Sequence, residues 1–281
     1  MKKSGLMLSV VACVFLVIPG FMTGALAGGF IQNIGEGSVN WTKGTIQGRG
    51  IGAPPEKFYG KPNARPMAIR AAKIVALRNI LETVNGIRVD SNTVVKDFAV
   101  QSDTIRSQVE GMVKGAREVN VEYMSDGTVE VIMQISMYGD FSRILLPQEI
   151  MAFPTETPGA APGAAPASGV LTGLVVDARG LGVRPAMAPK ILDEAGQEVY
   201  GSAFVSREFA VQQGMSGYAK DLDSARQNQR VTANPLVVKG LRVEGPGQCN
   251  IVISNTDAVR LRNSSADLSF LEKCRVMIVV D

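Results

Sequence analysis

The chain contains no histidine, so any chemistry it performs has to use carboxylates, hydroxyls, lysines or cysteines. This excludes Ser-His-Asp and Cys-His catalysis, histidine acid–base steps and histidine-ligated zinc or iron. Paired carboxylates remain, as in glycoside cleavage or calcium binding, and the acids to consider are Asp193, Glu194, Asp221 and Asp223. The last two would lie on different sides of a helix, and there is no calcium loop with its terminal Glu. We expect all four to be solvated surface charge.

A loop at residues 177–182 follows an apolar run, a position at which α/β folds often hold a phosphate or an acidic ligand. The loop lacks the glycine spacing of a dinucleotide fingerprint and the lysine of a P-loop. We therefore expect a plain turn that contains an Asp177–Arg179 pair.

Three aromatic residues, Trp41, Phe58 and Tyr59, have the side chains on which sugars stack. Trp41 alternates with Val39 along an expected strand, which favours packing in the core. No residue is assigned to catalysis, to a cofactor or to a metal.

The amino-terminal residues have the order of a cleavable signal peptide. Two lysines precede the apolar residues 6–18, and a small-x-small site ends at Ala27, so we expect cleavage between Ala27 and Gly28. The alternatives are an uncleaved anchor, for which the apolar run is short, and a lipid on Cys13, whose preceding residues match a lipoprotein box poorly.

The mature chain is close to neutral. The formal charge of +3 loses two lysines and no acid with the signal peptide, which leaves 27 cationic and 26 anionic side chains. With a balanced total and no basic runs, neither nucleic acid nor an anionic membrane surface is predicted as a partner.

Two cysteines, Cys249 and Cys274, remain after cleavage, an even number that suits an oxidising compartment. They are the candidates for a disulfide, which would stabilise the carboxyl-terminal part by about 3 kcal/mol. The alternative is two small buried thiols.

A proline-rich segment divides the chain. Residues 154–168 contain regularly spaced prolines among Ala, Gly and Thr and no apolar periodicity, which is typical of a semi-rigid linker. We predict a signal peptide over residues 1–27, a first domain over 28–153, this linker, and a second domain over 169–281, with the two domains packed independently.

The first domain is predicted to be a small α+β unit, an antiparallel sheet that carries helices on one face. Residues 38–46 read as two short strands, after which Gly48, Gly50 and Gly52 end the pairing. A helix from Pro66 to Val84, a second helix capped by Ser102 and a hairpin over residues 119–137 follow. The buried side of the first helix is predicted to consist of Ile74, Leu77, Leu81 and Val84.

The second domain is also predicted to be α+β, an antiparallel or mixed sheet with helices on one face. A helix is expected over residues 216–229. Strands are expected at residues 174–176, 191–192, 199–200, 235–238, 250–254 and 275–280.

Residues between positions 39 and 139 have the order and spacing of a known family. They are Asn40-Trp41-Thr42, Gly44, Ile46, Ala71-Ala72, Arg78-Asn79-Ile80-Leu81-Glu82, Gly86, Val89-Asp90-Ser91, Ser102-Asp103, Gly111, Gly115-Ala116 and residues 126–131. The first domain thereby resembles the LPP-twenty-like lipoprotein family, which includes the amino-terminal domain of flagellar assembly protein T. Two features depart from the family: no lipid-bearing Cys follows the cleavage site, and residues 169–281 do not resemble the later domains of the flagellar protein.

The resemblance implies a non-enzymatic bacterial envelope protein of the periplasm, associated with the outer membrane or with flagellar basal-body rings. It also implies envelope proteins, flagellar ring components or further copies of the chain as partners. We therefore expect an assembly or scaffold protein. A periplasmic glycan- or ligand-binding protein and a histidine-free hydrolase are the alternatives.

Overall fold

The computed structural model describes residues 29–146, 171–263 and 269–281. The expected cleavage between Ala27 and Gly28 and the expected linker at residues 154–168 lie outside the described residues. The described part is a mixed α+β protein, as predicted, and it has one sheet of five strands and one of seven. No helix within it is long and apolar enough to cross a bilayer.

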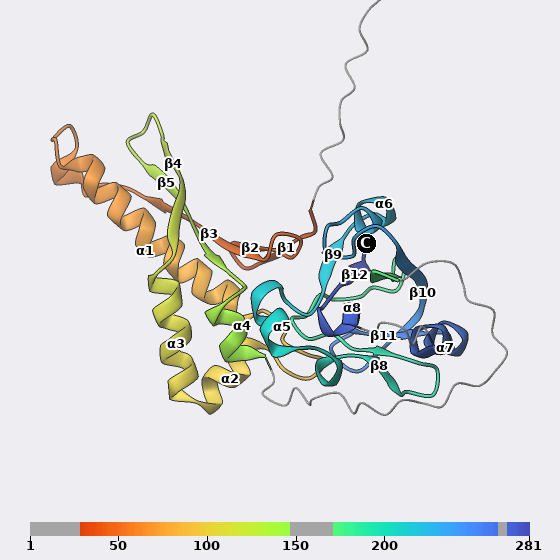
Figure 1. Ribbon diagram of the computed structural model, residues 1–281. Coiled ribbons are helices and arrows are strands. Elements are labelled where there is room, and N and C mark those ends of the chain that lie inside the picture. The colour runs from red at the N-terminus through yellow and green to blue at the C-terminus, as the bar shows by residue number, and fades with distance from the viewer. Residues whose placement is uncertain (1–28, 147–170, 264–268) are drawn as a thin grey trace, which may run out of the picture.

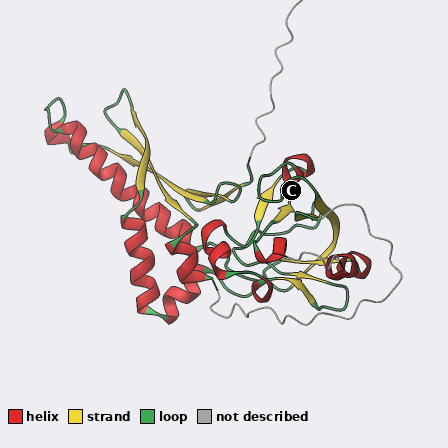
Figure 2. Ribbon diagram, viewed as in Figure 1, coloured by secondary structure: helices red, strands yellow, loops and turns green. Residues whose placement is uncertain are grey.

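The first sheet is antiparallel throughout, with the strand order β1-β2-β3-β5-β4 (Figure 1). Its long helix, α1, packs along one face (Figure 2). The strands are β1 (Ile31–Ile34), β2 (Gly37–Asn40), β3 (Thr45–Gly52), β4 (Arg117–Tyr123) and β5 (Val129–Ser136). The helices are η1 (Glu56–Phe58), α1 (Ala64–Asn85), α2 (Val95–Gln101), α3 (Asp103–Lys114) and α4 (Asp140–Leu145).

Helix α1 lies very close to β3 because small residues meet along the contact. A methyl group on Gly50 would come within 2.1 Å of the carbonyl oxygen of Ala72, so only a hydrogen atom fits there. The alanines are four residues apart and therefore share one side of the helix. The meeting residues are Gly48, Gly50 and Gly52 on β3 and Ala68, Ala72 and Ala76 on α1.

This contact corrects the buried side predicted for α1. Ile74 is 61% exposed and points away from the sheet, Leu77 and Leu81 are half-buried, and Val84 is buried as predicted. Large apolar residues were expected to mark the core. A strand lined with glycine instead requires alanine on the helix, because the two backbones nearly touch.

The same glycines correct the predicted end of β3. They do not stop the pairing, which continues with β5 from Thr45 to Gly52. The hairpin of β4 and β5 is confirmed, and so is the helix cap, in which the Ser102 hydroxyl accepts a hydrogen bond from the Ile105 amide at 3.3 Å. Strand β1 and helix α2 were not predicted.

The second sheet is mixed, with the order β8-β7-β11-β10-β6-β12-β9. Strands β10, β6, β12 and β9 run parallel to one another, whereas β11 is antiparallel to β10. The strands are β6 (Gly173–Asp177), β7 (Ile191–Leu192), β8 (Glu198–Tyr200), β9 (Gly217–Ala219), β10 (Pro235–Glu244), β11 (Asn250–Ile253) and β12 (Val276–Val279). The helices are η2 (Ser202–Phe204), α5 (Arg207–Gln213), α6 (Leu222–Arg226), α7 (Asn255–Asn263) and α8 (Ser269–Glu272).

The strands predicted for the second domain are all present, but the helix predicted over residues 216–229 is wrong. Strand β9 occupies its beginning, and the helix α6 is only five residues long. Tyr218, in β9, is buried, and its hydroxyl donates to the carbonyl oxygen of Ala186 at 2.9 Å and accepts from its amide at 3.0 Å. These long-range contacts stabilise residues 217–219 as a strand, and a local sequence pattern does not reveal them.

The two sheets do not pack independently, in contrast to the prediction. One continuous cluster of buried apolar side chains includes residues of both. The Trp41 ring meets the Tyr218 ring edge-on at 5.4 Å, and the Thr42 hydroxyl donates to the carbonyl oxygen of Tyr218 at 2.7 Å. Backbone hydrogen bonds also join the amides of Met187 and Ala188 to the segment that follows α1. The described residues therefore form a single folded body.

Candidate functional site: a polar row across the first sheet

The face of the first sheet opposite α1 carries a row of polar side chains that crosses every strand. Side chains alternate between the faces of a strand, so the residues between the buried positions point to this face. Strand register places five of them side by side, one on each of β1, β2, β3, β5 and β4: Asn33, Ser38, Gln47, Gln134 and Arg117. We call this set the polar row.

The middle of the polar row is ordered by a direct contact. The Gln47 side-chain amide donates to the Gln134 carbonyl oxygen at 2.8 Å, and Gln134 is only 8% exposed although no helix covers it. The ends of the row, Asn33 and Arg117, are exposed. At strand spacings of about 4.8 Å the row spans roughly 19 Å.

Two hollows lie along the polar row. One, of about 320 Å³, is lined by Asn33, Glu36, Ser38, Gln47, Arg49, Ile132 and neighbouring glycines. The other, of about 310 Å³, includes Ser38 and Gln47 again and extends to Arg117. Both hollows are open to solvent, so this face is an elongated polar depression.

An ion pair borders the row. Arg49 on β3 donates a hydrogen bond to Glu130 on β5, and Glu130 is 8% exposed. This hydrogen bond lowers the pKa of Glu130, against the opposing effect of burial, and the Arg49 charge lowers it further. A carboxylate that stays ionised and is already bonded suits a structural or binding role better than proton transfer.

The groups of the polar row are suited to hydrogen bonding with a ligand. Two amide side chains meet in it; the amides and the Ser38 hydroxyl both donate and accept hydrogen bonds, and the Arg117 guanidinium donates them. No cysteine or lysine is among the five, but Lys43 lines the same hollow as Ser38, whose neighbour on β3 is Gln47. The arrangement fits an extended polar chain laid across the strands.

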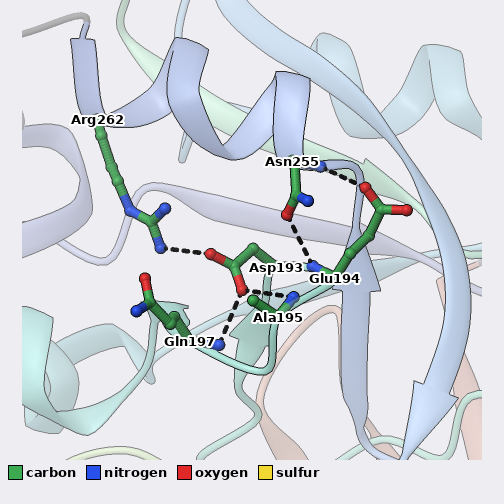
Figure 3. A network of polar contacts seen from close by, with 6 residues as sticks. All are labelled: Asp193, Glu194, Ala195, Gln197, Asn255 and Arg262. Atoms are coloured by element: carbon green, nitrogen blue, oxygen red, sulfur yellow. Dashed lines mark hydrogen bonds and ion pairs between the residues drawn. The ribbon is translucent and has the colours of Figure 1, made fainter.

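The carboxylates that the sequence singled out are structural. Asp193, expected to be solvated, is 3% exposed and accepts hydrogen bonds from the amides of Ala195 and Gln197 and from the Arg262 side chain at 2.9 Å (Figure 3). Burial raises the pKa of Asp193, but these hydrogen bonds and the Arg262 charge outweigh it and lower the pKa overall. The expectation of surface charge is wrong for this residue, because it closes the turn between β7 and β8.

Its neighbour Glu194 joins the same turn to α7. The Glu194 carboxylate accepts from the Asn255 amide at 2.9 Å, and the Asn255 side chain accepts from the Glu194 amide at 3.2 Å (Figure 3). Asp221, in turn, caps α6 by accepting from the Ser224 amide at 2.7 Å. Glu194, Asp221 and Asp223 are exposed, as predicted, and no group of three or more metal-ligating side chains occurs in the described residues.

The turn after β6 agrees with the sequence. Arg179 donates to both carboxylate oxygens of Asp177, at 2.8 and 2.7 Å, and the hydrogen bond lowers the pKa of Asp177. Trp41 is 4% exposed and lies in the core, as predicted, where it packs against Tyr218 of the second sheet and its indole N–H donates to Gln32 at 2.8 Å. The alternative of a sugar-stacking Trp41 therefore has no support.

The second sheet corresponds to a known domain family. Residues 173–281 match the second domain of Treponema pallidum Tp0624. The match begins at the first residue of β6 and contains every strand of the second sheet. It covers less than half of the chain, so it describes what this part is similar to. Comparison with curated proteins finds no match.

The two cysteines lie in this Tp0624-like part and are free in the structure, which contradicts the expected disulfide. Cys249 precedes β11 and Cys274 precedes β12, and the two strands are three spacings apart, about 14 Å. They also run in opposite directions, so the two cysteines lie at opposite ends of the strands. A disulfide needs Cα atoms within about 7 Å. Burial raises the pKa of each thiol to about 11.

Sequence reasoning missed the polar row, although its signal is visible. The predicted hairpin assigned alternate apolar residues of β5 to the core, and the residues between them include Glu130 and Gln134. The apolar face of β5 was predicted correctly, and the polar residues on its opposite face belong to the site. What the sequence does not contain is the strand order that aligns these positions with Asn33 and Ser38.

Proposed function

We propose that this protein is an exported, non-enzymatic assembly or scaffold protein of the bacterial envelope that binds a protein partner along the polar row. The observation that carries the proposal is the alignment of five polar side chains across all five strands on the face that α1 leaves uncovered. The signal-peptide pattern of residues 1–27 and the LPP-twenty-like residues of the first part support an envelope location.

The shape of the depression favours a polypeptide. Its length of roughly 19 Å corresponds to five or six residues of extended chain. The backbone N–H and C=O groups of such a peptide would form hydrogen bonds with the side-chain amides of Gln47 and Gln134. Asn33 and Arg117 would contact the two ends of the peptide. The adjacent edge strand β4 is exposed along nearly its whole length, so a partner could also extend across it.

The decisive experiment compares one triple variant with a control. Full-length mature protein carrying Asn33→Ala, Gln47→Ala and Arg117→Ala is used to capture proteins from the envelope fraction beside wild type. The control, Arg242→Ala with Val259→Ala, changes exposed residues of the second sheet and α7. We expect a protein species retained by wild type and control and reduced at least tenfold with the triple variant.

A crosslinking measurement identifies where that partner lies. A photoreactive residue at position 33 or 117 should crosslink to the captured species, and one at position 259 should not. A partner that crosslinks only at position 259, or equal capture by the triple variant, would refute the polar row as the binding site. Self-crosslinking at position 33 would make the partner a second copy of the chain.

A glycan is the second candidate ligand, because side-chain amides such as those of Asn33 and Gln47 pair well with sugar hydroxyls. Retention on peptidoglycan or on a glycan array, lost in the same triple variant, would favour it. Retention without loss in the variant would place sugar binding elsewhere. Hydrolysis of the bound glycan would contradict the non-enzymatic role.

A further inference from the structure

The charge of the protein is balanced in total but segregated along the chain. Residues 57–81 contain six cationic side chains and no Asp or Glu, between the acids Glu56 and Glu82. This segment contains the loop after η1 and most of α1. The six cations are Lys57, Lys61, Arg65, Arg70, Lys73 and Arg78.

Two of these cations are engaged by the first sheet. Lys73 forms an ion pair with Glu118 of β4 at 2.8 Å, and the Arg65 guanidinium stacks on the Tyr123 ring at 5.2 Å. Among the described residues, the structure gives Lys57, Lys61, Arg70 and Arg78 no ion pair with a carboxylate.

The outer side of α1 combines positive charge with apolar surface. Met67 and Ile74 are seven residues apart and so lie above one another on the helix, and Arg70 and Arg78 lie on either side of that line. Ile74 is 61% exposed. Helices α2 and α3 pack near the carboxyl-terminal end of α1, so its first half stands clear of other helices (Figure 1).

The loop before α1 repeats this combination. The Lys57 and Lys61 ammonium groups lie 5.1 and 5.6 Å from the centre of the Phe58 ring, and Tyr59 is 55% exposed. Aromatic rings beside cations are typical of segments that rest at a membrane surface, where the ring enters the headgroup layer.

We propose that these residues form a binding surface for an anionic phospholipid bilayer, on which α1 lies parallel to the membrane plane. We call it the basic face of α1, and it consists of Lys57, Phe58, Tyr59, Lys61, Met67, Arg70, Ile74 and Arg78. Its cations meet lipid phosphates while Met67 and Ile74 enter the headgroup boundary. The helix spans about 33 Å and remains on the surface rather than crossing the bilayer.

The charge and the apolar residues of this face favour a bilayer over a second copy of the chain or a soluble polyanion. A second copy packed symmetrically on the same helix would bring like charges together, which is unfavourable. A soluble polyanion such as nucleic acid would pair with the arginines but would leave Ile74 exposed to water. A bilayer accommodates both the cations and the apolar line. The proposal is separate from the polar row and holds whether or not a protein binds there.

The test is sedimentation of full-length mature protein with lipid vesicles. Vesicles of phosphatidylcholine with about one-third phosphatidylglycerol are compared with pure phosphatidylcholine at roughly 0.15 M salt. Wild type should bind the anionic vesicles at least tenfold more tightly. Because one cation near such a surface contributes roughly a fivefold gain in affinity, Arg70→Glu with Arg78→Glu should weaken binding by roughly 25-fold or more.

Two further variants keep the result unambiguous. Arg226→Glu with Arg242→Glu makes the same change in net charge on the second sheet and α6, and its binding should stay within about twofold of wild type. Ile74→Ser should weaken vesicle binding severalfold without changing the charge. Equal loss in the Arg226 and Arg242 variant, or no effect of Ile74→Ser, would overturn the proposal, the latter in favour of a soluble polyanion. Circular dichroism of each variant confirms that it is folded.

Discussion

The contact between α1 and β3 makes a sharp prediction for Gly50→Ala. The new methyl carbon would lie 2.1 Å from the Ala72 carbonyl oxygen and 2.4 Å from the Ala76 amide nitrogen, whereas ordinary contacts begin at 3.4 Å. Helix α1 would have to withdraw by about 1.3 Å, and a close-packed interior resists such a shift. Overpacking costs about 1–3 kcal/mol, and a clash with backbone atoms belongs at the upper end, so we expect a loss of about 3 kcal/mol.

Gly111→Ala is the matched control because it makes the same chemical change with the opposite expected sign. Gly111 lies inside α3, and a methyl group there meets no atom within 4 Å. Alanine is favoured over glycine in a helix by roughly 0.5–1 kcal/mol. In a protein of this size 1 kcal/mol corresponds to about 2–4 °C, so Gly50→Ala should lower Tm by about 6–12 °C and Gly111→Ala should raise it by about 1–4 °C.

Thermal unfolding followed by circular dichroism measures both variants. A third variant, Gly50→Ala with Ala72→Gly, should show no recovery, because the methyl group meets the Ala72 backbone rather than its side chain. Recovery in this double variant, or a Tm for Gly50→Ala within about 2 °C of wild type, would show that the helix and strand are farther apart than described.

The remaining predictions concern the thiols, the linker and the amino terminus. Cys249 and Cys274 should resist labelling in native protein at neutral pH and should react without reductant once the protein unfolds. Their folded-state pKa of about 11 exceeds an unfolded value of about 8.5, so their contribution to stability should be constant below about pH 8.5 and lost as pH rises through 11. Alanine at both positions should reduce this loss of stability at high pH. Limited proteolysis should cut first within residues 154–168, and the two fragments should co-elute in gel filtration because the sheets share one core; separate elution would contradict the shared core. Intact mass of exported protein should correspond to cleavage between Ala27 and Gly28 without a lipid.

Local patterns predicted the elements that local forces determine. Strands β4 and β5 form a hairpin in which the alternate apolar residues of β5 are buried, and Ser102 caps α3 through a contact three residues away. Both features are determined by neighbours in sequence. They could therefore be predicted without knowing the fold.

The errors arose where distant segments determine the outcome. Ile74 was assigned to the core because nothing in α1 itself indicates that its partner strand is lined with glycine. The disulfide was expected because two cysteines remain in an exported protein, and only the order and direction of the strands place Cys249 and Cys274 far apart. The prediction of no anionic membrane partner is untested; it used the total charge, which does not show that residues 57–81 are uniformly cationic.

The joining of the two sheets also has a consequence for biogenesis. Thr42 and Tyr218, which meet in the folded protein, are 176 positions apart in the chain. Synthesis at about 5–20 residues per second separates their appearance by roughly 10–35 s. During that interval Trp41 has no ring to pack against, and the first sheet carries an uncovered apolar patch. We expect the nascent protein to depend on a chaperone until its last strands are made, although its first sheet is complete long before.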